Sequence, residues 1–475
     1  MRKDSDFLGE VEIEDSVYYG VQTLRATQNF AVSGVSHYEM QNYIKSVALI
    51  KKAAALANHT CGALSAKICE AICKASDEVI DGKFANSFPI DVFQGGGGTS
   101  TNMNLNEVIA CRANEILTGE KSYSVIHPNT HVNMGQSTND VIPAAMKMTA
   151  YKNLETLLKS VKYFTKILTD KKDEYADVLR LGRTCLQDAV PMTFGQYFGG
   201  YVGFMKRMED KIHILMDECL ELPLGATAIG TSLSVNDGYL DEIYEKLYEI
   251  SGVKFRSETN FFDGLANADF YISLSATLKR IATTLSKMAT DFRILSSGPR
   301  AGINELTIPA VQPGSSIMPG KVNPVMPELI NQIGYQICGN DMAITMAVEG
   351  GELDLNVWEP VIIKNLCESF KLLENGLVLF ADKCVKDLAP NIEICKAYAS
   401  NSTALSTTIS SIFGYKVGTK VARKAFDENK SVKDVVLELG ILNKEQADEV
   451  LDPMVMISPK RSSAVIKKYK EIYKN

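Results

Sequence analysis

The residues best suited to chemistry lie in the segment GSSIMPGKVNP, at positions 314–324. Two adjacent hydroxyls, Ser315 and Ser316, precede a single cation, Lys321, and the side-chain amide of Asn323. The prolines and glycines between them prevent a regular helix or strand, so the segment is expected to form a loop. Hydroxyl and amide donors with one cation suit the binding of a small anion, followed by a reaction that moves charge onto a carboxylate.

Three further segments place Ser or Thr hydroxyls beside glycine or asparagine: GGGGTSTNMN (95–104), GQSTND (135–140) and GRT (182–184). Glycine lets the backbone approach a ligand closely and adopt positive φ, and successive N–H groups can then form an anion-binding nest. Each segment taken alone is more typical of a turn or a helix cap than of a binding site. It is their shared composition that indicates an anion site.

Motifs for cofactors and metals are missing. No lysine follows GGGGTS at the spacing of a phosphate-binding loop, and no GxSxG element marks a hydrolase nucleophile. His127 and His131 are spaced like metal ligands, but Pro128 and Asn129 lie between them, which argues against one shared helix face. The sequence therefore predicts neither a cofactor nor a metal.

Charge and composition exclude several classes of protein. The 475 residues carry a net charge of −7, so nothing favours nucleic acid as a partner. No run of about 18 apolar residues predicts a membrane span, and the N-terminus lacks the apolar core of a secretion signal. The ten cysteines include no CxxC pair and are expected to be reduced thiols. Together these features predict a cytoplasmic protein.

Long helices must position these segments, because much of the chain between them lacks proline and shows helical spacing of apolar residues. The segment ETLLKSVKYFTKIL places Leu157, Val161, Phe164 and Leu168 on one face. Four other long segments follow the same pattern, which predicts a central bundle of five long helices. Strand-like alternation is weak, so the fold is expected to be mainly α.

Three domains are expected. They are a mixed helical N-terminal domain (1–136), a central long-helix bundle (137–389) and a small helical C-terminal domain (390–475). In the first domain, helices are expected around 40–58 and 64–80. In the last, the serine of SVKD is expected to cap a helix that the next glycine ends.

In this order along the chain, the four segments resemble the signature regions of the aspartase/fumarase superfamily. The segment GSSIMPGKVNP matches the family's signature loop without gaps, and the likeness covers nearly the whole chain. The segments VMPELINQIGYQICGND and LDLNVWEPVI lean toward the aspartases rather than the fumarases. The resemblance implies a homotetramer in which five helices per subunit form a twenty-helix core, with each active site assembled from three subunits. It also implies reversible elimination of ammonia from L-aspartate to give fumarate, without a cofactor.

The resemblance assigns the base and the groups that hold the developing charge. Ser315 would remove the C3 proton of the substrate as an activated oxyanion, which the loop must stabilise through backbone N–H groups and a nearby cation. Gly314 and Gly320 would let the loop close over the substrate and exclude water. Removing the proton turns the β-carboxylate into an enediolate. Its expected hydrogen-bond donors are Thr99, Ser137, Thr138 and Ser316.

The remaining roles concern the other end of the substrate. Lys321 and Asn323 would hold the α-carboxylate, the lysine as a point charge and the amide as a directional partner. Asn139 and Thr184 would contact the amino group that leaves. Glu328 follows the loop and either supports the site or, as an acid at a helix N-terminus, complements the helix dipole.

Position 185 departs from the family pattern. Fumarases have histidine after Gly-Arg-Thr, whereas this chain has Cys185, which can neither carry a proton as imidazole does nor offer an amide's two donors. This argues against fumarase chemistry, unless the position only packs beside the ligand. The alternatives are another lyase of the superfamily, fumarase-like or acting on a different amino acid, and a non-catalytic structural paralogue. The presence of Ser315, Lys321 and Asn323 argues against the paralogue.

Overall fold

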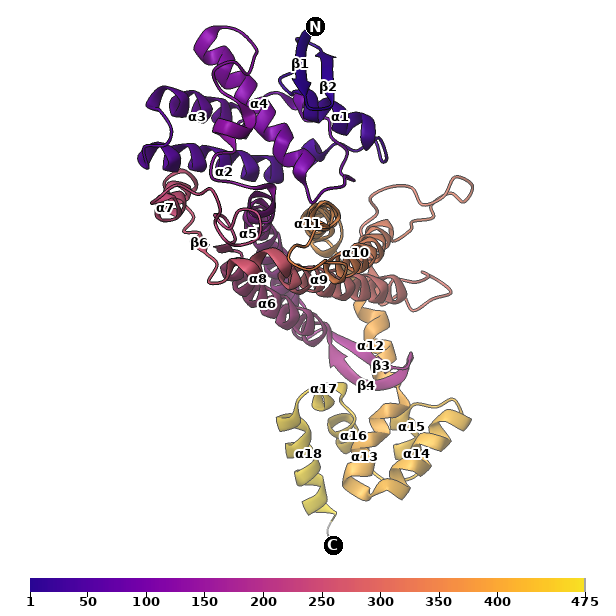
Figure 1. Cartoon of the computed structure of the whole chain (residues 1–475). Helices are drawn as coiled ribbons and strands as arrows, with labels where there is room; N and C mark the ends of the chain where they lie inside the picture. The colour runs from indigo at the N-terminus through magenta and orange to yellow at the C-terminus, as the bar shows by residue number, and fades with distance from the viewer. Residues whose placement is uncertain (474–475) are drawn as a thin grey trace. The chain divides into compact units, whose positions relative to one another are not determined.

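The computed structural model describes residues 1–473, and it confirms the prediction of a mainly helical fold (Figure 1). The chain divides into two compact units. Unit 1 consists of residues 1–159, 209–283 and 333–374, and unit 2 consists of residues 160–208, 284–332 and 375–475.

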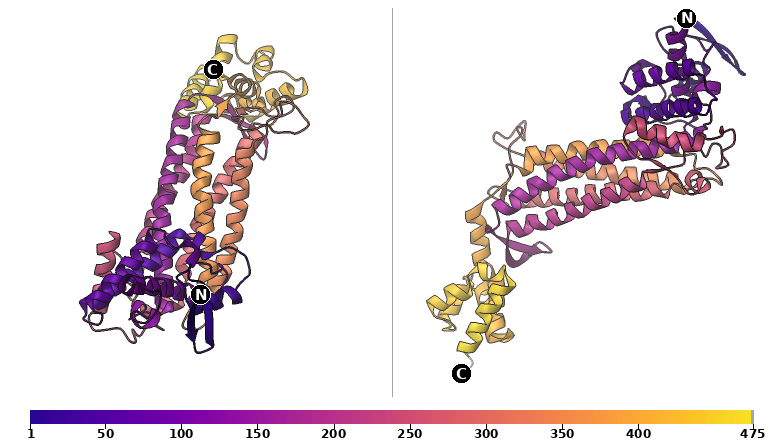
Figure 2. Two further views of the ribbon diagram at one scale, coloured as in Figure 1. Left: turned by 90° about the horizontal axis from the view of Figure 1, so that it is seen from above. Right: turned by 90° about the vertical axis from the view of Figure 1, so that its left-hand side faces the viewer.

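The five long helices predicted from the sequence are present, and they lie side by side (Figure 2). Their bounds are α5 (Thr138–Glu174), α6 (Phe194–Glu218), α9 (Asp269–Leu295), α10 (Val325–Glu349) and α11 (Glu359–Phe380). The apolar face predicted for 155–168 is buried, with Leu157, Val161, Phe164 and Leu168 fully inaccessible to solvent. Helical spacing of these residues therefore created the face that the bundle buries.

In unit 1, polar side chains join neighbouring long helices. Ser275 Oγ of α9 donates to Asp341 Oδ1 of α10 at 2.7 Å, and Asn340 Nδ2 of α10 donates to Ser369 Oγ of α11 at 3.0 Å. The other helices of this unit are α1 (Val21–Asn29), α2 (Gln41–Thr60), α3 (Ala66–Ile80), α4 (Thr99–Thr118), α7 (Tyr239–Ser251) and α8 (Phe261–Ala266). Its strands are the antiparallel pair β1 (Arg2–Asp6) and β2 (Gly9–Ile13) and the parallel pair β5 (Glu221–Leu222) and β6 (Arg256–Ser257).

In unit 2, the ends of the long helices meet through aromatic rings and amides. Phe164 of α5 stacks on Phe380 of α11 with ring centroids 5.8 Å apart, and Asn331 Nδ2 of α10 donates to the Ser286 carbonyl of α9 at 2.8 Å. Two antiparallel strand pairs belong to this unit: β3 (Leu179–Thr184) with β4 (Gln187–Thr193), and β7 (Leu306–Thr307) with β8 (Ala389–Pro390).

Short helices complete unit 2 at the C-terminal end of the chain. They are α12 (Ile392–Asn401), α13 (Ser406–Phe413), α14 (Tyr415–Asp427), α15 (Val432–Glu438), α16 (Lys444–Val450), α17 (Pro453–Met456) and α18 (Pro459–Ile472). Buried residues between Leu405 and Tyr469 form a core of their own. The division into three domains stays a prediction.

None of the helices in residues 1–473 combines the length and the apolar character that a membrane span requires.

Candidate active site

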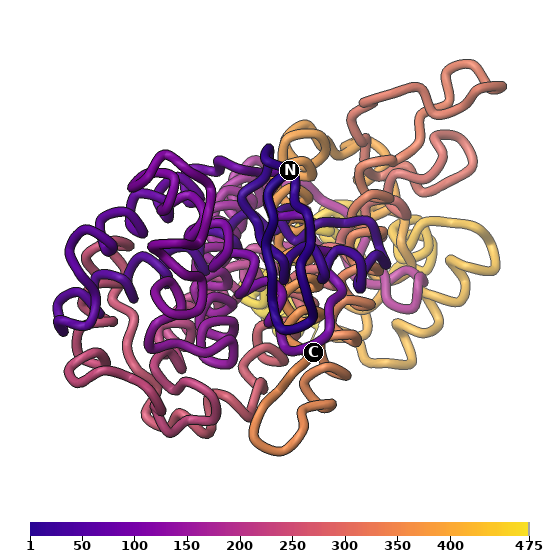
Figure 3. The backbone as a smooth tube through the Cα atoms, turned by 45° about the horizontal axis from the view of Figure 1, so that its top comes forward, coloured from indigo at the N-terminus to yellow at the C-terminus, as the bar shows by residue number. Residues whose placement is uncertain are grey.

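The loop formed by residues 308–324 joins β7 to α10 and extends away from α9 and α10 (Figures 1 and 3). A neck of hydrogen bonds closes it. Gly314 N donates to the Lys321 carbonyl at 2.8 Å, and Asn323 Nδ2 donates to the Gly314 carbonyl at 2.6 Å. A Cβ at position 314 would lie 2.6 Å from both Lys321 O and Asn323 N, so only glycine fits this neck.

The two glycines expected to form a hinge therefore differ in their structural roles. Gly314 permits close backbone approach and is not in the left-handed region. Gly320 has φ +78°, and an added Cβ would meet no atom within 4 Å, so this glycine supplies conformational freedom alone. Closure of the loop over a ligand stays a prediction.

Ser315 lies at the start of this loop, where backbone N–H groups point at its hydroxyl oxygen. Ser315 Oγ accepts hydrogen bonds from Met318 N at 2.9 Å and from Ile317 N at 3.2 Å. Two donors aimed at one oxygen stabilise negative charge on it. Ser315 is half-buried, whereas its neighbour Ser316 is exposed.

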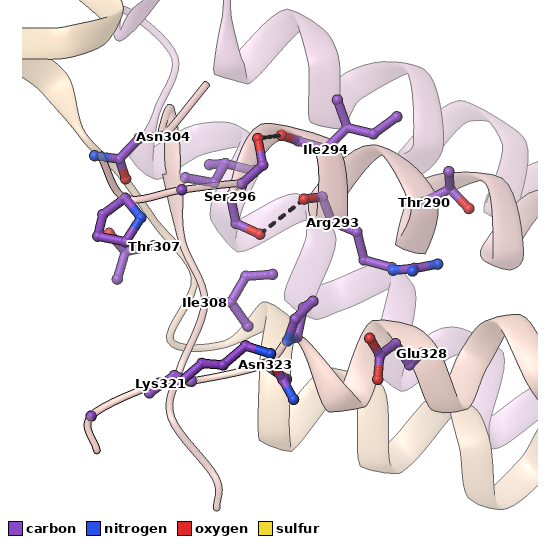
Figure 4. A pocket seen from close by; sticks show the side chains of 17 residues that line it. Thr290, Arg293, Ile294, Ser296, Asn304, Thr307, Ile308, Lys321, Asn323 and Glu328 are labelled. Carbon is purple, nitrogen blue, oxygen red and sulfur yellow. Dashed lines mark hydrogen bonds between the residues drawn. The ribbon is translucent and has the colours of Figure 1, made fainter. Parts of the chain in front are cut away.

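A cavity of about 900 Å³ lies in unit 2 beside this loop (Figure 4). It brings together three of the predicted residues, Lys321 and Asn323 of the loop and Glu328 of α10. Ser315 and Ser316 do not line it. Glu328 lies in the first turn of α10, so it faces the cavity and also complements the helix dipole, and both sequence interpretations remain compatible with its place.

In unit 1, the glycine-rich segment forms the entry to helix α4. Gly96, Gly97 and Gly98 have φ values of +84°, +59° and +79°, and Thr99 is the first residue of the helix. Thr99 is exposed, and its hydroxyl donates to the Gly96 carbonyl at 2.7 Å. Successive left-handed residues before a helix N-terminus form the kind of nest that attracts anions. An alanine at any of these three positions would be strained.

The segment GQSTND forms the entry to helix α5, and Asp140 holds it in place. Asp140 Oδ1 accepts from Ser137 N at 2.9 Å, and its Oδ2 accepts from Gly225 N and Thr227 N, each at 3.0 Å. Burial raises the pKa of Asp140 to about 6, and these three N–H groups oppose that rise. Asn139 Nδ2 donates to the Ala228 carbonyl at 2.7 Å, which adds a third tie to residues 225–228.

Helices α4 and α5 bring Thr99 and the Ser137–Asn139 segment to the same region of unit 1. Asn102, one turn into α4, donates through Nδ2 to Thr138 Oγ1 at 3.2 Å. A Cβ on Gly98 would lie 3.0 Å from Ile142 of α5, which shows how closely the two helix N-termini approach. The predicted donors Thr99, Ser137 and Thr138 therefore share one side of unit 1.

Thr184 and Cys185 lie at the tip of the hairpin β3–β4 in unit 2. Thr184 pairs with Gln187, so Cys185 and Leu186 form a two-residue turn, and their φ values are +53° and +60°. Both turn residues are exposed. A turn with two left-handed residues favours asparagine and glycine, so Cys185 and Leu186 are strained here. Such strain is typical of functional segments.

A buried ion pair supports the base of this hairpin. Arg183 Nη1 donates to Glu305 Oε2 at 2.8 Å, and the Glu305 side chain is fully buried. Arg180 Nη2 lies 3.8 Å from the same oxygen. The two arginines flank one carboxylate, so the strand that ends in Thr184 is anchored by charge as well as by backbone pairing.

Two residues that the sequence patterns did not indicate, Asp140 and Lys51, organise the polar segments of unit 1. Lys51 of α2 is fully buried, and its Nζ donates to Asn102 Oδ1 at 2.7 Å, Asn133 Oδ1 at 2.9 Å and Gln136 Oε1 at 2.9 Å. Burial lowers the pKa of Lys51 to about 7, and the charge of Asp140 opposes this shift. A lysine within the apolar run VALIKKAAALA was the only signal in the sequence.

Within residues 1–473, no group of three or more His, Cys, Asp and Glu side chains is arranged to hold a metal ion.

Comparison with known proteins identifies the class to which this fold and site belong. The sequence profile of a family described as lyase matches residues 9–339, and a profile described as fumarase C C-terminus matches residues 403–458. The chain therefore belongs to this lyase family. The resemblance read from the four polar segments is confirmed.

The curated relatives specify the branch more narrowly. The aspartate ammonia-lyase of Helicobacter pylori is 44% identical over 460 residues, covering 97% of this chain and 98% of the relative. The aspartate ammonia-lyase of Bacillus subtilis is 44% identical over 461 residues, covering 96% of each.

Solved structures confirm the fold. A fumarate lyase:delta crystallin from Brucella melitensis bound to cobalt superposes with a TM-score of 0.93 at 40% identity, covering 96% of this chain and all of that one. A class II fumarase from Schistosoma mansoni gives a TM-score of 0.93 at 37% identity, covering 96% of this chain and 99% of that one.

Proposed function

We propose that this chain catalyses the reversible deamination of L-aspartate to fumarate and ammonia. Relatives named aspartate ammonia-lyase match it over nearly their full length at 44% identity, which supports a carbon–nitrogen lyase. The observation that carries the proposal is the pair of N–H groups directed at Ser315 Oγ, because a serine can act as a base only where its oxyanion is stabilised.

The reaction begins with proton removal by Ser315. Its oxyanion takes the proton from C3 of the substrate, and the electron pair of that C–H bond moves into the β-carboxylate to give an enediolate. The pair then returns to form the C2–C3 double bond while the C2–N bond breaks. The nitrogen leaves as ammonia with the electrons of that bond. The proton held by Ser315 then passes to the released ammonia to give ammonium, which restores the Ser315 oxyanion and completes the cycle.

Hydroxyl groups hold the enediolate, which carries more negative charge than the carboxylate from which it forms. The donors are Thr99, Ser137, Thr138 and Ser316. One such donor contributes roughly 10²–10³ in rate when it is well placed. Two features support this role for the three donors of unit 1. The N-terminus of α4 has no side-chain cap, and Asp140 holds the backbone of Ser137 just before α5.

The α-carboxylate binds to Lys321 and Asn323, which line the same cavity. One N–H of the Asn323 amide already bonds the Gly314 carbonyl, and its second N–H is left for the ligand. Asn139 and Thr184 contact the amino group of the substrate. Cys185 and Glu328 support the residues that bind the substrate and do not contact it themselves. The strained turn that follows Thr184 supports a functional role for the hairpin tip.

The active enzyme is a homotetramer in which segments of three subunits complete each site. Helix α10 supports self-association, because Tyr335, Met342 and Met346 lie on one of its faces and are 67%, 62% and 59% exposed in the single chain. Spacings of seven and four residues place the three on a stripe that a second copy can cover. A cytoplasmic location completes the proposal, supported by ten cysteines that are all free thiols.

The activity can be tested by following fumarate through its ultraviolet absorbance after mixing the purified protein with L-aspartate or with L-malate. Fumarate from aspartate alone is the expected result, and it would show that Cys185 is compatible with deamination. Fumarate from malate alone, or from neither substrate, would overturn the proposal.

The role of Ser315 as the general base is tested by the variant Ser315→Ala. The matched control is Ser463→Ala, which changes an exposed serine in a helix. We expect Ser315→Ala to abolish elimination while the melting temperature and the oligomeric state stay as in the unmodified enzyme. Ser463→Ala should leave all three unchanged. Substantial activity in a folded Ser315→Ala enzyme would contradict the role of Ser315.

A further inference from the structure

A fully buried cation lies behind the hydroxyl donors of unit 1. Lys51 Nζ lies 2.7–2.9 Å from three neutral side-chain oxygens, those of Asn102, Asn133 and Gln136. Three acceptors match the three N–H groups of the ammonium form, so these contacts favour the charged state against the burial that lowers the pKa of Lys51. No carboxylate is among these partners, so the charge is solvated by amide dipoles and is not neutralised by contact. Burying a cation in this way is costly for folding, and an apolar side chain would fill the space more cheaply.

The lysine fixes the orientation of the Asn102 amide. An ammonium group only donates, so the side-chain oxygen of Asn102 must face Lys51 and its nitrogen must face the other way. That nitrogen donates to Thr138 Oγ1 at 3.2 Å and to Asn133 Oδ1 at 3.2 Å. Because Thr138 Oγ1 accepts a bond from Asn102, its single hydroxyl proton remains available for another acceptor.

We propose that Lys51 is a positioning residue that acts through Asn102 to present the Thr138 hydroxyl as a donor to the β-carboxylate of the substrate. This inference rests on the proposed function and deepens it. The chain of bonds from ammonium to amide to hydroxyl points in one direction, so each member polarises the next. The Thr138 O–H bond thereby becomes more polarised where the enediolate forms, and no cation has to contact the substrate.

A second hydrogen bond from Lys51 orders the turn that precedes Ser137, the donor next to Thr138. Gln136 accepts from Lys51 and donates through Nε2 to the Val132 and Met134 carbonyls at 3.0 and 3.2 Å. Gln136 directly precedes Ser137, so the turn that presents Ser137 is tied to the same buried charge. Lys51 therefore supports two of the predicted donors at once.

The relay is tested with three variants assayed for fumarate formation from L-aspartate. Lys51→Met removes the charge and keeps the length of the side chain. Asn102→Asp keeps a hydrogen-bonded partner for Lys51 but removes the N–H that Thr138 accepts, so the Thr138 proton turns toward the new carboxylate. Lys52→Met is the matched control, because Lys52 is the next residue and pairs with Asp77 at the surface, at 2.7 Å.

We expect Lys51→Met and Asn102→Asp each to lower kcat at least about tenfold, with KM for aspartate changed less than about threefold, because the enediolate needs the donor more than the substrate does. Lys52→Met should change kcat less than about twofold. Asn102→Asp decides the outcome if Lys51→Met fails to fold, since a purely structural lysine would tolerate a new buried counter-ion and leave kcat unchanged.

Folded variants with unchanged kcat, or with a rise in KM alone, would overturn the relay while leaving the proposed function intact. An unmodified enzyme that makes no fumarate from aspartate would instead overturn the proposed function, and this inference with it.

Discussion

Replacing Gly314 by alanine should impair catalysis without destabilising the fold. The new methyl group would lie 2.6 Å from Lys321 O and from Asn323 N, well inside van der Waals contact. These are backbone atoms, so no side-chain rotation can relieve the overlap, and the neck of the loop must open. Opening displaces Ser315, Lys321 and Asn323 together, because all three are ordered by the same neck.

The size of the effect follows from the bonds that close the neck. Opening breaks Gly314 N to Lys321 O at 2.8 Å and Asn323 Nδ2 to Gly314 O at 2.6 Å. Each neutral hydrogen bond contributes roughly 0.5–1.5 kcal/mol, so the loop conformation with both neck bonds formed becomes less favourable by about 1–3 kcal/mol. If only this conformation is catalytically competent, kcat/KM falls by about 5- to 150-fold.

Gly440→Ala provides the matched control. Gly440 lies just beyond α15 with φ +62° and nothing within 4 Å of an added Cβ, so alanine there suffers only the left-handed penalty of roughly 1–2 kcal/mol. We expect this variant to melt at a lower temperature with unchanged kcat/KM. Gly314→Ala should lower kcat/KM and leave the melting temperature unchanged. Most residues of its loop are exposed and contribute little to global stability.

Steady-state kinetics on aspartate and differential scanning calorimetry measure the two quantities. A Gly314→Ala enzyme with full kcat/KM would refute the claim that the neck orders the site. A matching loss of activity in Gly440→Ala would show that the assay reports stability instead.

Two further predictions concern strain and pH. Leu186→Gly should raise the melting temperature, because Leu186 has φ +60° in the Cys185–Leu186 turn and glycine adopts this conformation without strain. The expected stabilisation is about 1 kcal/mol. Calorimetry that shows no rise would mean that the turn is unstrained. His37 is buried between Thr101 and Asn104, and burial lowers its pKa from 6.5 to about 4. Between these pH values only the unfolded chain binds the proton, so stability falls by roughly 3 kcal/mol as pH drops from 6.5 to 4. Urea unfolding of His37→Gln across that range should show a shallower fall, and an identical slope in both proteins would exclude this source of acid sensitivity.

Helices were predictable from the sequence because their signals are local. The helices expected around 40–58 and 64–80 are α2 (Gln41–Thr60) and α3 (Ala66–Ile80). The serine of SVKD caps α15, with Ser431 Oγ accepting from Asp434 N at 3.0 Å, and Gly440 follows in the left-handed region. Periodicity and cap chemistry act over a few residues, so one segment carries the whole signal.

The strands and part of the site escaped prediction because they depend on distant partners. The hairpin β3–β4 carries Pro191 and a turn of Cys185 and Leu186, none of which favours a strand or a tight turn. Lys51 meets oxygens from positions 102, 133 and 136, and no spacing in the sequence reveals that meeting. Asp140 stood within the segment GQSTND, but its backbone partners Gly225 and Thr227 lie 85 and 87 residues further along the chain.

The charge arrangement of the proposed relay suits an elimination better than a simple binding site. A cation in direct contact with the β-carboxylate would stabilise the substrate almost as much as the enediolate, and such uniform binding does not raise kcat. Thr138 is a neutral donor whose bond strengthens as negative charge grows, while Lys51 lies one amide behind it, shielded from water. With a net charge of −7 on the whole chain, the attraction for an anion must be local. In the proposed relay, a buried charge that acts through an amide and a hydroxyl supplies that attraction where the enediolate would form.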